Sequence, residues 1–309
     1  MSDPLGEHDN IVAGFQVDGR TVRGRISRLG TTLDKILSAH DYPEPVARLL
    51  GEAVIVAALV GNSLKFDGRL IVQANGDGPI AFIVAEYVTG EGVRGFAKMD
   101  RERVEAVLAD NPPADAIMHR LLGKGAFAMT IDQGAKMDRY QGVVALDGPN
   151  LSAAAEAYFA QSEQMPTRIR IAVGEIWDKG EASQWRGGGA LLQSVAGDET
   201  RGSAEDDWDH ARALFETVED AELLDPDLSA GELLYRLFNE DGVRLLEPTA
   251  VERRCSCTED RLMEVIARFP QDDREHMTRD GQIVMTCEYC NRDWRFLPED
   301  VEAAAAGQR

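Results

Sequence analysis

The residues of this sequence best suited to chemistry are its four cysteines, Cys255, Cys257, Cys287 and Cys290. The first 254 residues contain no cysteine, and all four then fall between positions 255 and 290. They form a Cys-x-Cys pair and a Cys-x-x-Cys pair, separated by residues 258–286. In a reducing compartment such clustering indicates metal ligation or thiol redox chemistry ahead of a framework of structural disulfides.

Four thiolates make a complete ligand set for Zn²⁺. Zinc prefers tetrahedral coordination by sulfur, and four cysteines leave no open position for a substrate. The spacing therefore predicts one zinc ion per chain, held by all four cysteines, and argues against a catalytic zinc. His276 lies between the pairs but is not needed, because the sulfurs already fill the shell. A segment this small has little core of its own, so we expect the metal to keep it folded.

The same cysteines could act as a redox switch. Sulfurs bound to one tetrahedral zinc lie about 3.8 Å apart, whereas a disulfide joins two sulfurs at about 2.05 Å. Two cysteines therefore cannot bind the zinc and form a disulfide with each other at the same time. Oxidation would join neighbours most readily, Cys255 with Cys257 and Cys287 with Cys290, because their loops are the shortest. The tight Cys-x-Cys ring should be the more easily reduced of the two. Most four-cysteine zinc sites are inert, however, so the spacing alone leaves switching open.

Local signals predict the elements that would position these cysteines. A strand over residues 283–285 leads into the Cys-x-x-Cys turn, and Asn291 suits the left-handed conformation that ends such a turn. The residues between the two pairs predict a helix over 259–268 and a shorter helical turn over 272–277. Gly281 then allows the chain to reverse toward the first pair.

Residues 11–195 have the pattern of a mixed α/β core. Helical periodicity covers residues 43–64, and a turn sequence at 75–79 between two β-rich runs predicts a hairpin. The run Gly187-Gly188-Gly189 is interpreted as a break in the pattern. The predicted strands are 70–74, 80–84, 127–131, 143–146 and 167–173, with a further helix over 151–164.

An acidic region follows the core. Residues 197–209 are poor in apolar side chains and are predicted to form a mobile connection. Two amphipathic helices are then expected, over 208–221 and 229–238, the second with Ser229 as N-cap and Glu232 as its capping-box partner. The predicted fold class is α+β. Its parts are a mixed α/β core domain over 1–193, a helical linker over 194–245, a small zinc-binding redox-switch domain over 246–300 and a tail over 301–309.

Composition argues against several classes of protein. A net charge of −21 and a pI near 4.6 disfavour nucleic-acid binding, because a phosphate backbone attracts clustered Lys and Arg. The basic stretch 20–28 is interpreted as a solvated strand edge. The polar first ten residues do not resemble a signal peptide, and the longest apolar run, 53–60, is too short to span a bilayer. We therefore expect a soluble, cytoplasmic protein.

The sequence also lacks recognisable catalytic motifs. It contains no His-Glu-x-x-His zinc-hydrolase pattern. Gly123-Lys124-Gly125 lacks the rest of a phosphate-binding loop and is interpreted as a turn. We expect no enzyme activity. The main alternative is a constitutive zinc module that binds protein or nucleic acid, which would need a basic face and would bind equally well with reduced cysteines.

Beyond the cysteines, the chain resembles the redox-regulated 33-kDa heat-shock holdases, also called 33-kDa chaperonins. The resemblance runs from about residue 11 to residue 296 and includes both cysteine pairs at the family's usual separation. One departure is Thr258, where the family usually has Ser; Thr can also cap the following helix. The other matching motifs are Tyr42-Pro43, Leu64-Lys65-Phe66, Gly76-Asp77-Gly78-Pro79, Tyr158 with Ser162-Glu163-Gln164, Gly188-Gly189 with Leu191-Leu192-Gln193, and Leu234-Tyr235-Arg236-Leu237-Phe238 with Val243-Arg244 and Pro248.

This resemblance implies a mechanism. In the family, the reduced, zinc-bound form is an inactive monomer, and oxidants such as hypochlorite convert the thiolates into two disulfides between neighbours and release zinc. The linker then unfolds and exposes apolar surface that holds unfolding client proteins without ATP, often in a dimer. Ordinary core packing would explain the apolar linker residues equally well. Those that could form the client surface are Leu214, Phe215, Leu223, Leu224, Leu233, Leu234 and Leu237.

Overall fold

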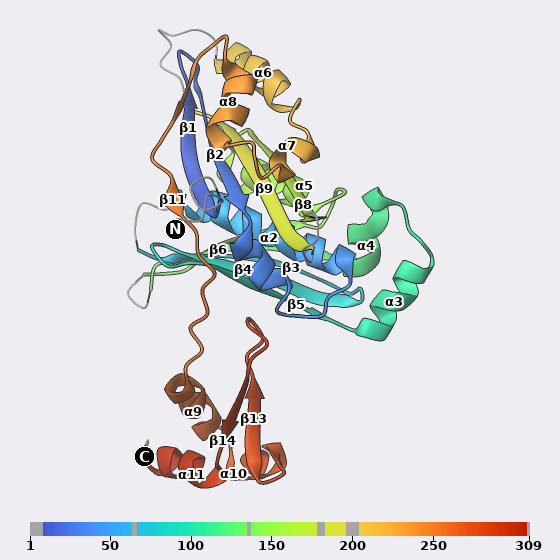
Figure 1. Ribbon diagram of the computed structural model, residues 1–309, viewed down its shortest axis with the longest axis vertical. Coiled ribbons are helices and arrows are strands. Elements are labelled where there is room, and N and C mark those ends of the chain that lie inside the picture. Colours follow the sequence, from blue (N-terminus) through green and yellow to red (C-terminus); the bar gives the residue numbers. More distant parts are fainter. Residues whose placement is uncertain (1–8, 64–66, 135–136, 178–182, 196–203, 308–309) are drawn as a thin grey trace. The chain divides into compact units, whose positions relative to one another are not determined.

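The computed structural model describes residues 9–63, 67–134, 137–177, 183–195 and 204–307 (Figure 1). By its internal contacts the chain divides into two units, Met1–Arg253 and Arg254–Arg309. The predicted α+β class is confirmed, whereas the finer division into 1–193, 194–245, 246–300 and 301–309 stays a prediction. The Leu64-Lys65-Phe66 motif and the part of the acidic connection over 197–203 lie outside the described residues.

The first unit consists of two antiparallel sheets with helix α2 (Glu44–Gly61) between them (Figure 1). Fourteen of the 18 residues of α2 are buried, because from Ala53 onward the helix is apolar on every side and it packs against both sheets. One sheet has the strand order β10-β1-β2-β9-β8, with β11 also paired to β1, and the other has the order β5-β4-β3-β6-β7. The strands of the first sheet are β1 (Ile11–Val17), β2 (Val22–Leu29), β8 (Thr167–Ile176), β9 (Gln184–Ser194), β10 (Val243–Leu245) and β11 (Thr249–Ala250).

The second sheet contains both predicted strand pairs. Strands β3 and β4 form the expected hairpin around the turn at 77–79, and β6 pairs with β7. The predicted helix over 151–164 is present as α5, followed by one π-helical turn. The remaining elements of this part are β3 (Arg69–Gly76), β4 (Ile80–Val88), β5 (Gly92–Met99), β6 (Gly125–Asp132), β7 (Tyr140–Ala145), α1 (Thr31–Leu37), α3 (Arg101–Ala109), a 3₁₀ turn (Ala114–Ala116), α4 (Ile117–Leu122), α5 (Leu151–Tyr158) and the π turn (Phe159–Glu163).

The interpretation of the glycine run as a break is wrong, because Gly187-Gly188-Gly189 lies inside β9. The glycines are there to let neighbouring elements approach. A Cβ added at Gly189 would lie 2.5 Å from the Ile55 side chain of α2, and one at Gly188 would lie 2.2 Å from the Leu223 carbonyl oxygen on the opposite face. A strand covered closely on both faces requires small residues at these points.

The interpretation of residues 20–28 as a strand edge is also wrong. Strand β2 lies in the interior of its sheet, paired with β1 on one side and β9 on the other. Arg28 is almost fully buried, and its guanidinium donates to the carbonyl oxygens of Glu222 and Asp225, at the C-terminal end of a helix. A partner strand more than 150 residues away in the sequence is not visible in local composition.

Three helices cover the face of the first sheet that points away from α2: α6 (Ala204–Phe215), α7 (Asp220–Leu224) and α8 (Ala230–Phe238). The segment predicted as one helix over 208–221 therefore forms two helices, α6 and α7, and α6 begins at Ala204 rather than at residue 208. The capping box of α8 is confirmed, since the Ser229 hydroxyl accepts from the Glu232 amide at 3.2 Å and the Glu232 carboxylate accepts from the Ser229 amide at 2.9 Å.

The second unit is a small module built around a three-stranded sheet of order β12-β13-β14. Its elements are α9 (Glu259–Ala267), α10 (Gln271–Met277), β12 (Thr278–Arg279), β13 (Gln282–Thr286), β14 (Asp293–Phe296) and α11 (Pro298–Gly307). Five buried apolar side chains make its core: Leu262, Ile266, Ile283, Phe296 and Val301. Within the part of the chain that the structure describes, no helix has the length and apolar character needed to cross a membrane.

Candidate metal and thiol-redox centre

The structure brings all four predicted cysteines together in the second unit. The Sγ atom of Cys255 lies 3.1 Å from that of Cys257 and 3.6 Å from that of Cys287, and the Sγ atoms of Cys257 and Cys290 are 3.5 Å apart. All four sulfurs lie within 4.8 Å of one another, and no two are joined as a disulfide. The three shortest separations are slightly below the roughly 3.8 Å expected between sulfurs on one tetrahedral zinc ion. Because all four sulfurs also lie within 4.8 Å of one another, the four residues fit such an ion.

The first pair lies in an extended segment held at both ends. On the N-terminal side, Val251 is fully buried, and its carbonyl oxygen accepts a hydrogen bond from the Thr32 hydroxyl at 2.9 Å. On the C-terminal side, Thr258 is the N-cap of α9, and its hydroxyl accepts from the Arg261 amide at 3.3 Å. The Arg261 side chain also donates to the Ser256 hydroxyl at 3.0 Å, between the two cysteines. The Cys-x-Cys segment is therefore short and anchored.

The second pair lies in the turn between β13 and β14. The Cys287 amide donates to the Arg292 carbonyl at 3.0 Å, and the Asn291 amide donates to the Cys287 carbonyl at 2.7 Å. Asn291 has the predicted left-handed conformation, with φ of 54°. Gly281, with φ of 78°, allows the tight reversal between β12 and β13. This hairpin geometry places Cys287 and Cys290 on the same side of the turn as the first pair.

The pKa shifts of the clustered thiols indicate that the cluster needs a balancing positive charge. Burial raises the pKa of the Cys257 thiol, and its hydrogen bond with Cys255 raises it further. Burial alone would also raise the pKa of Cys255, but hydrogen bonds from the neighbouring thiols outweigh it and lower that pKa. Burial raises the pKa of Cys287 as well. Of the three thiols with shifted pKa values, only Cys255 is shifted toward the thiolate, so four adjacent thiolates require a cation to balance their charge.

The cysteines are also open to reagents, because each of them is only half-buried. A small oxidant can therefore reach the sulfurs without prior unfolding. His276, considered earlier as a ligand, lies outside the cluster: its ring Nδ1 is 2.6 Å from the Asp272 carbonyl oxygen in α10. Among the residues that the structure describes, the four cysteines form the group that could hold a metal ion.

The apolar linker residues form a second functional candidate, in the first unit. Phe215, Leu223, Leu233, Leu234 and Leu237 are all buried, and Leu214 and Leu224 pack against the same cluster. Sequence reasoning identified the helices but not the surface they cover, because strand partners are distant in sequence. That surface is formed by Ala13, Phe15, Val17, Val22, Ile26, Ala172, Ala190 and Leu192.

Comparison with known proteins gives concordant results. A family model described as Hsp33 protein matches residues 10–297. A 33 kDa chaperonin of Caulobacter vibrioides is 51% identical over 301 residues, covering 96% of this chain and 98% of its own. One from Serratia proteamaculans is 38% identical over 304 residues, covering 98% of this chain and 97% of its own. The crystal structure of the 33 kDa chaperonin of Thermotoga maritima has a similar fold, with a TM-score of 0.78, 21% identity, and coverage of 97% of this chain and 99% of that one.

Proposed function

Because the chain belongs to the Hsp33 family of chaperones, we propose that it is a redox-regulated holdase that binds unfolding proteins without ATP. Its switch is the cluster of Cys255, Cys257, Cys287 and Cys290. The single observation that carries this proposal is the contact among four half-buried thiols, with sulfur–sulfur distances of 3.1 to 3.6 Å between the closest ones. Such a cluster suits both metal binding and disulfide formation.

In the reduced state the four thiolates hold one zinc ion. When bound, zinc supplies the divalent charge that the clustered thiolates require and links the two ends of the module, which in small zinc modules contributes about 10–16 kcal/mol of apparent binding free energy. Apart from the cysteines, the described part of the module has a small apolar core, a cluster of five buried side chains, to hold it together. The module's fold therefore depends on the cross-link that the sulfurs make.

Oxidation removes that cross-link. With hypochlorous acid, one thiolate takes Cl⁺ to form a sulfenyl chloride and releases hydroxide; the neighbouring thiolate then attacks this sulfur, forms the disulfide and expels chloride. Two disulfides consume two oxidant molecules and four thiols. The distances also allow cross-pairing, since Cys257 is 3.5 Å from Cys290. The shorter loops favour Cys255 with Cys257 and Cys287 with Cys290.

The change reaches the linker helices through the chain itself. Strands β10 and β11, which follow α8, pair with β1, and Arg253 forms an isolated bridge with Val93. One residue, Arg254, then separates this paired segment from Cys255. Loss of order around Cys255 would weaken β11 and β10 first and α8 next. Release of α6–α8 exposes their apolar sides and the sheet face beneath, and this surface binds clients.

The proposed function places the protein in the cytoplasm, with unfolded proteins as its partners. Thiols at metal-binding spacing suit the reducing cytoplasm, where they stay reduced until an oxidant appears. Clients are unfolded or partly unfolded proteins, and the exposed apolar face would also allow the oxidised chain to form a homodimer. Sedimentation of reduced and oxidised protein tests the dimer separately from the switch. Membranes, nucleic acids and enzyme activity have no part in this function.

Activity and metal content, measured on the same samples, test the function. Reduced full-length protein should carry one zinc per chain, and hypochlorite should release it together with the loss of four thiols. Light scattering of a heat-denatured client should show suppression of aggregation only after oxidation. Glu264→Gln, on the exposed side of α9 in the same unit, serves as the control for Cys257→Ser, which should hold zinc weakly and protect clients without oxidant.

The alternative, a constitutive zinc-dependent interaction module, predicts different results. It would suppress aggregation, or bind its partner, equally well before and after oxidation. Retention of zinc after four thiols are lost, or equal protection by the reduced and oxidised forms, would contradict the proposed switch.

A further inference from the structure

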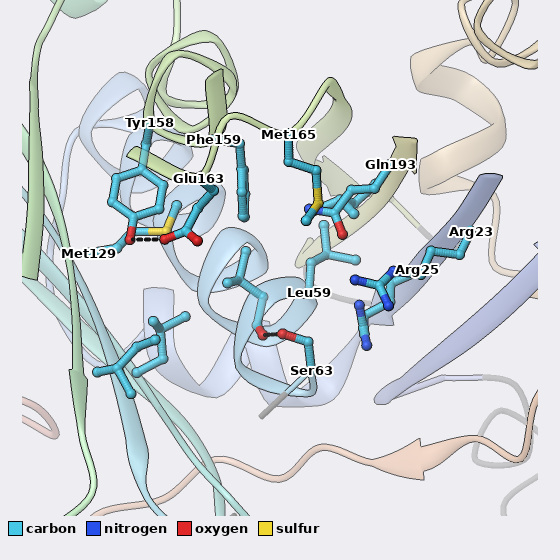
Figure 2. Close-up of a pocket in the computed structure, with 14 residues that line it drawn as sticks. Arg23, Arg25, Leu59, Ser63, Met129, Tyr158, Phe159, Glu163, Met165 and Gln193 are labelled. Atoms are coloured by element: carbon cyan, nitrogen blue, oxygen red, sulfur yellow. Dashed lines mark hydrogen bonds between the residues drawn. The ribbon is translucent and has the colours of Figure 1, made fainter. Parts of the chain in front are cut away.

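A pocket of about 190 Å³ lies between the two sheets of the first unit, beside the C-terminal end of α2 (Figure 2). Strand β2 contributes Arg23 and Arg25, the last turn of α2 contributes Leu59, and Ser63 follows just after the helix. The remaining walls come from β3, β6, β9 and the segment that follows α5. The pocket is thus formed by the described residues of one unit and is separate from the cysteines and from the surface under α6–α8.

One end of the pocket is strongly cationic. Arg23 and Arg25 are two residues apart on β2, so they point to the same face of the sheet, and Figure 2 shows them side by side. Among the described residues, neither guanidinium has a hydrogen-bond or ion-pair partner, and the Nε of Arg25 is buried without one. Burial, and then the adjacent charge of Arg23, lower the pKa of Arg25.

Two neighbouring arginines without a carboxylate partner among the described residues stand out in such an acidic chain. It has 54 acidic residues against 33 basic ones, and most of its described arginines near the first sheet have carboxylate or carbonyl partners, as Arg20 and Arg28 do. Arg23 is exposed, whereas Arg25 is half-buried, and a partly desolvated cation beside a second cation is unfavourable unless something supplies negative charge. The sites where polar groups lack partners are sites where a ligand is expected.

The middle of the pocket is apolar. Leu59, Met129 and Leu191 are at most 1% exposed, and the Phe159 ring and Met165 lie between the cationic end and the opposite end (Figure 2). Met side chains adapt to irregular ligand shapes, and aromatic rings provide flat apolar contact. A hydrated inorganic ion would leave this wall unused, so the pocket suits a ligand with an apolar body.

The opposite end is closed by the π-helical turn. Glu163 accepts hydrogen bonds from the hydroxyls of Tyr140 at 3.2 Å and Tyr158 at 3.3 Å, so its charge is directed away from the arginines (Figure 2). Gln164 ends the turn with a left-handed φ of 51°. A π-helical turn is uncommon, and such turns are frequent at functional sites. Here it brings Phe159 and Glu163 into one wall.

We propose that this pocket binds a small organic carboxylate with a short aliphatic or aromatic body, whose carboxylate is held by Arg23 and Arg25 and whose body packs on Leu59, Met129 and Phe159. A guanidinium pair matches the two oxygens of a carboxylate. The volume is below that of typical drug-sized ligand sites, so the ligand is correspondingly small. This binding is independent of the proposed redox switch.

Octanoate is a suitable probe, used with the reduced, zinc-loaded full-length protein so that the surface under α6–α8 stays covered. Isothermal titration should show saturable binding at one site per chain. Octanamide, which has the same body without the charge, and inorganic phosphate, which has charge without the body, should each bind at least tenfold more weakly. Arg25→Gln should weaken octanoate binding at least tenfold, whereas Arg103→Gln, an exposed arginine of α3, should not.

A second measurement locates the site without a variant. With ¹³C-labelled methionine methyl groups, octanoate should shift the signals of Met129 and Met165, which line the pocket, and leave Met263 and Met277 of the second unit unchanged. Equal binding of octanoate and octanamide, equal affinity in Arg25→Gln and Arg103→Gln, or octanoate-induced shifts confined to other methionines would each overturn the proposal. So would binding of phosphate as tight as that of octanoate.

Discussion

The Asp207 carboxylate accepts hydrogen bonds from both the backbone amide and the hydroxyl of Thr21, at 2.9 and 3.0 Å. Asp207 lies in the first turn of α6, and Thr21 lies in the turn between β1 and β2. Arg20 pairs with Asp207 at 3.2 Å and with Asp241, beyond α8, at 2.6 Å. One hairpin turn thus holds the two ends of the linker helices, which makes these contacts a determinant of how readily the helices are released.

Asp207→Asn should loosen α6, because the amide cannot accept from Thr21 and pair with Arg20 as the carboxylate does. We expect the free energy of local opening to fall by about 1–2 kcal/mol. Hydrogen exchange of the amides of α6 measures this, and the variant should become an active chaperone at lower oxidant concentration. Glu205→Gln removes one exposed charge from the same helical turn, and it should change neither the hydrogen exchange of α6 nor the oxidant concentration needed for activity. Identical exchange in the two variants would argue against a role for Asp207.

Glu52 should make stability depend on pH. Burial raises the pKa of this carboxyl to about 7, although it accepts a hydrogen bond from the Leu151 amide. Its folded pKa lies above the ordinary value of 4.5, so the folded state binds the extra proton between these two values. The free energy of unfolding therefore falls as pH rises from about 4.5 to 7.

Glu52→Gln tests this, because the amide keeps an acceptor for Leu151 without the charge. The variant should match the wild type near pH 4 and exceed its stability by about 3 kcal/mol near pH 8. Urea unfolding across this pH range is the measurement, with exposed Glu102→Gln as the control. Parallel stability profiles for wild type and Glu52→Gln would refute the assignment.

Gly188 and Gly231 should respond in opposite directions to the same change. Gly188→Ala would place a Cβ 2.2 Å from the Leu223 carbonyl oxygen, so α7 must shift away from β9. Gly231, in α8, has only a Leu245 methyl at 3.9 Å, so alanine there should stabilise the helix by about 0.5–1 kcal/mol. Aggregation assays should show activity of Gly188→Ala at lower oxidant concentration, and a higher oxidant requirement for Gly231→Ala. The same shift in both variants would contradict the packing argument.

Val301 should support the cysteine module from a helix that lies beyond the family match, which ends at residue 297. Its side chain is fully buried, and its neighbour Glu302 pairs with Arg274 at 2.8 Å. Val301→Ala should destabilise the module by about 1–2 kcal/mol and speed zinc transfer to a chelator. Glu299→Ala, on the exposed side of α11, is the control. Unchanged hydrogen exchange over residues 258–296 would exclude a supporting role.

Several features of this protein were predictable because they depend on neighbours a few residues away. The Thr258 cap, the left-handed Asn291 and the capping box of Ser229 with Glu232 all arise from short hydrogen bonds or local sterics. The hairpin of β3 and β4 follows from turn residues between two alternating runs. The grouping of the cysteines was predictable as well, since their spacing suits a single metal ion.

Tertiary structure alone decided the features that depend on distant partners. The pairing of β2 with β9 turned an apparently solvated basic stretch into an interior strand and left Arg23 and Arg25 facing a pocket between two sheets. The approach of Ile55 to one face of β9 and of Leu223 to the other turned a glycine break into a strand. Sequence by itself determined local conformation and ligand type, because those follow from covalent geometry and side-chain chemistry. Which surfaces meet follows from how the whole chain fills its core.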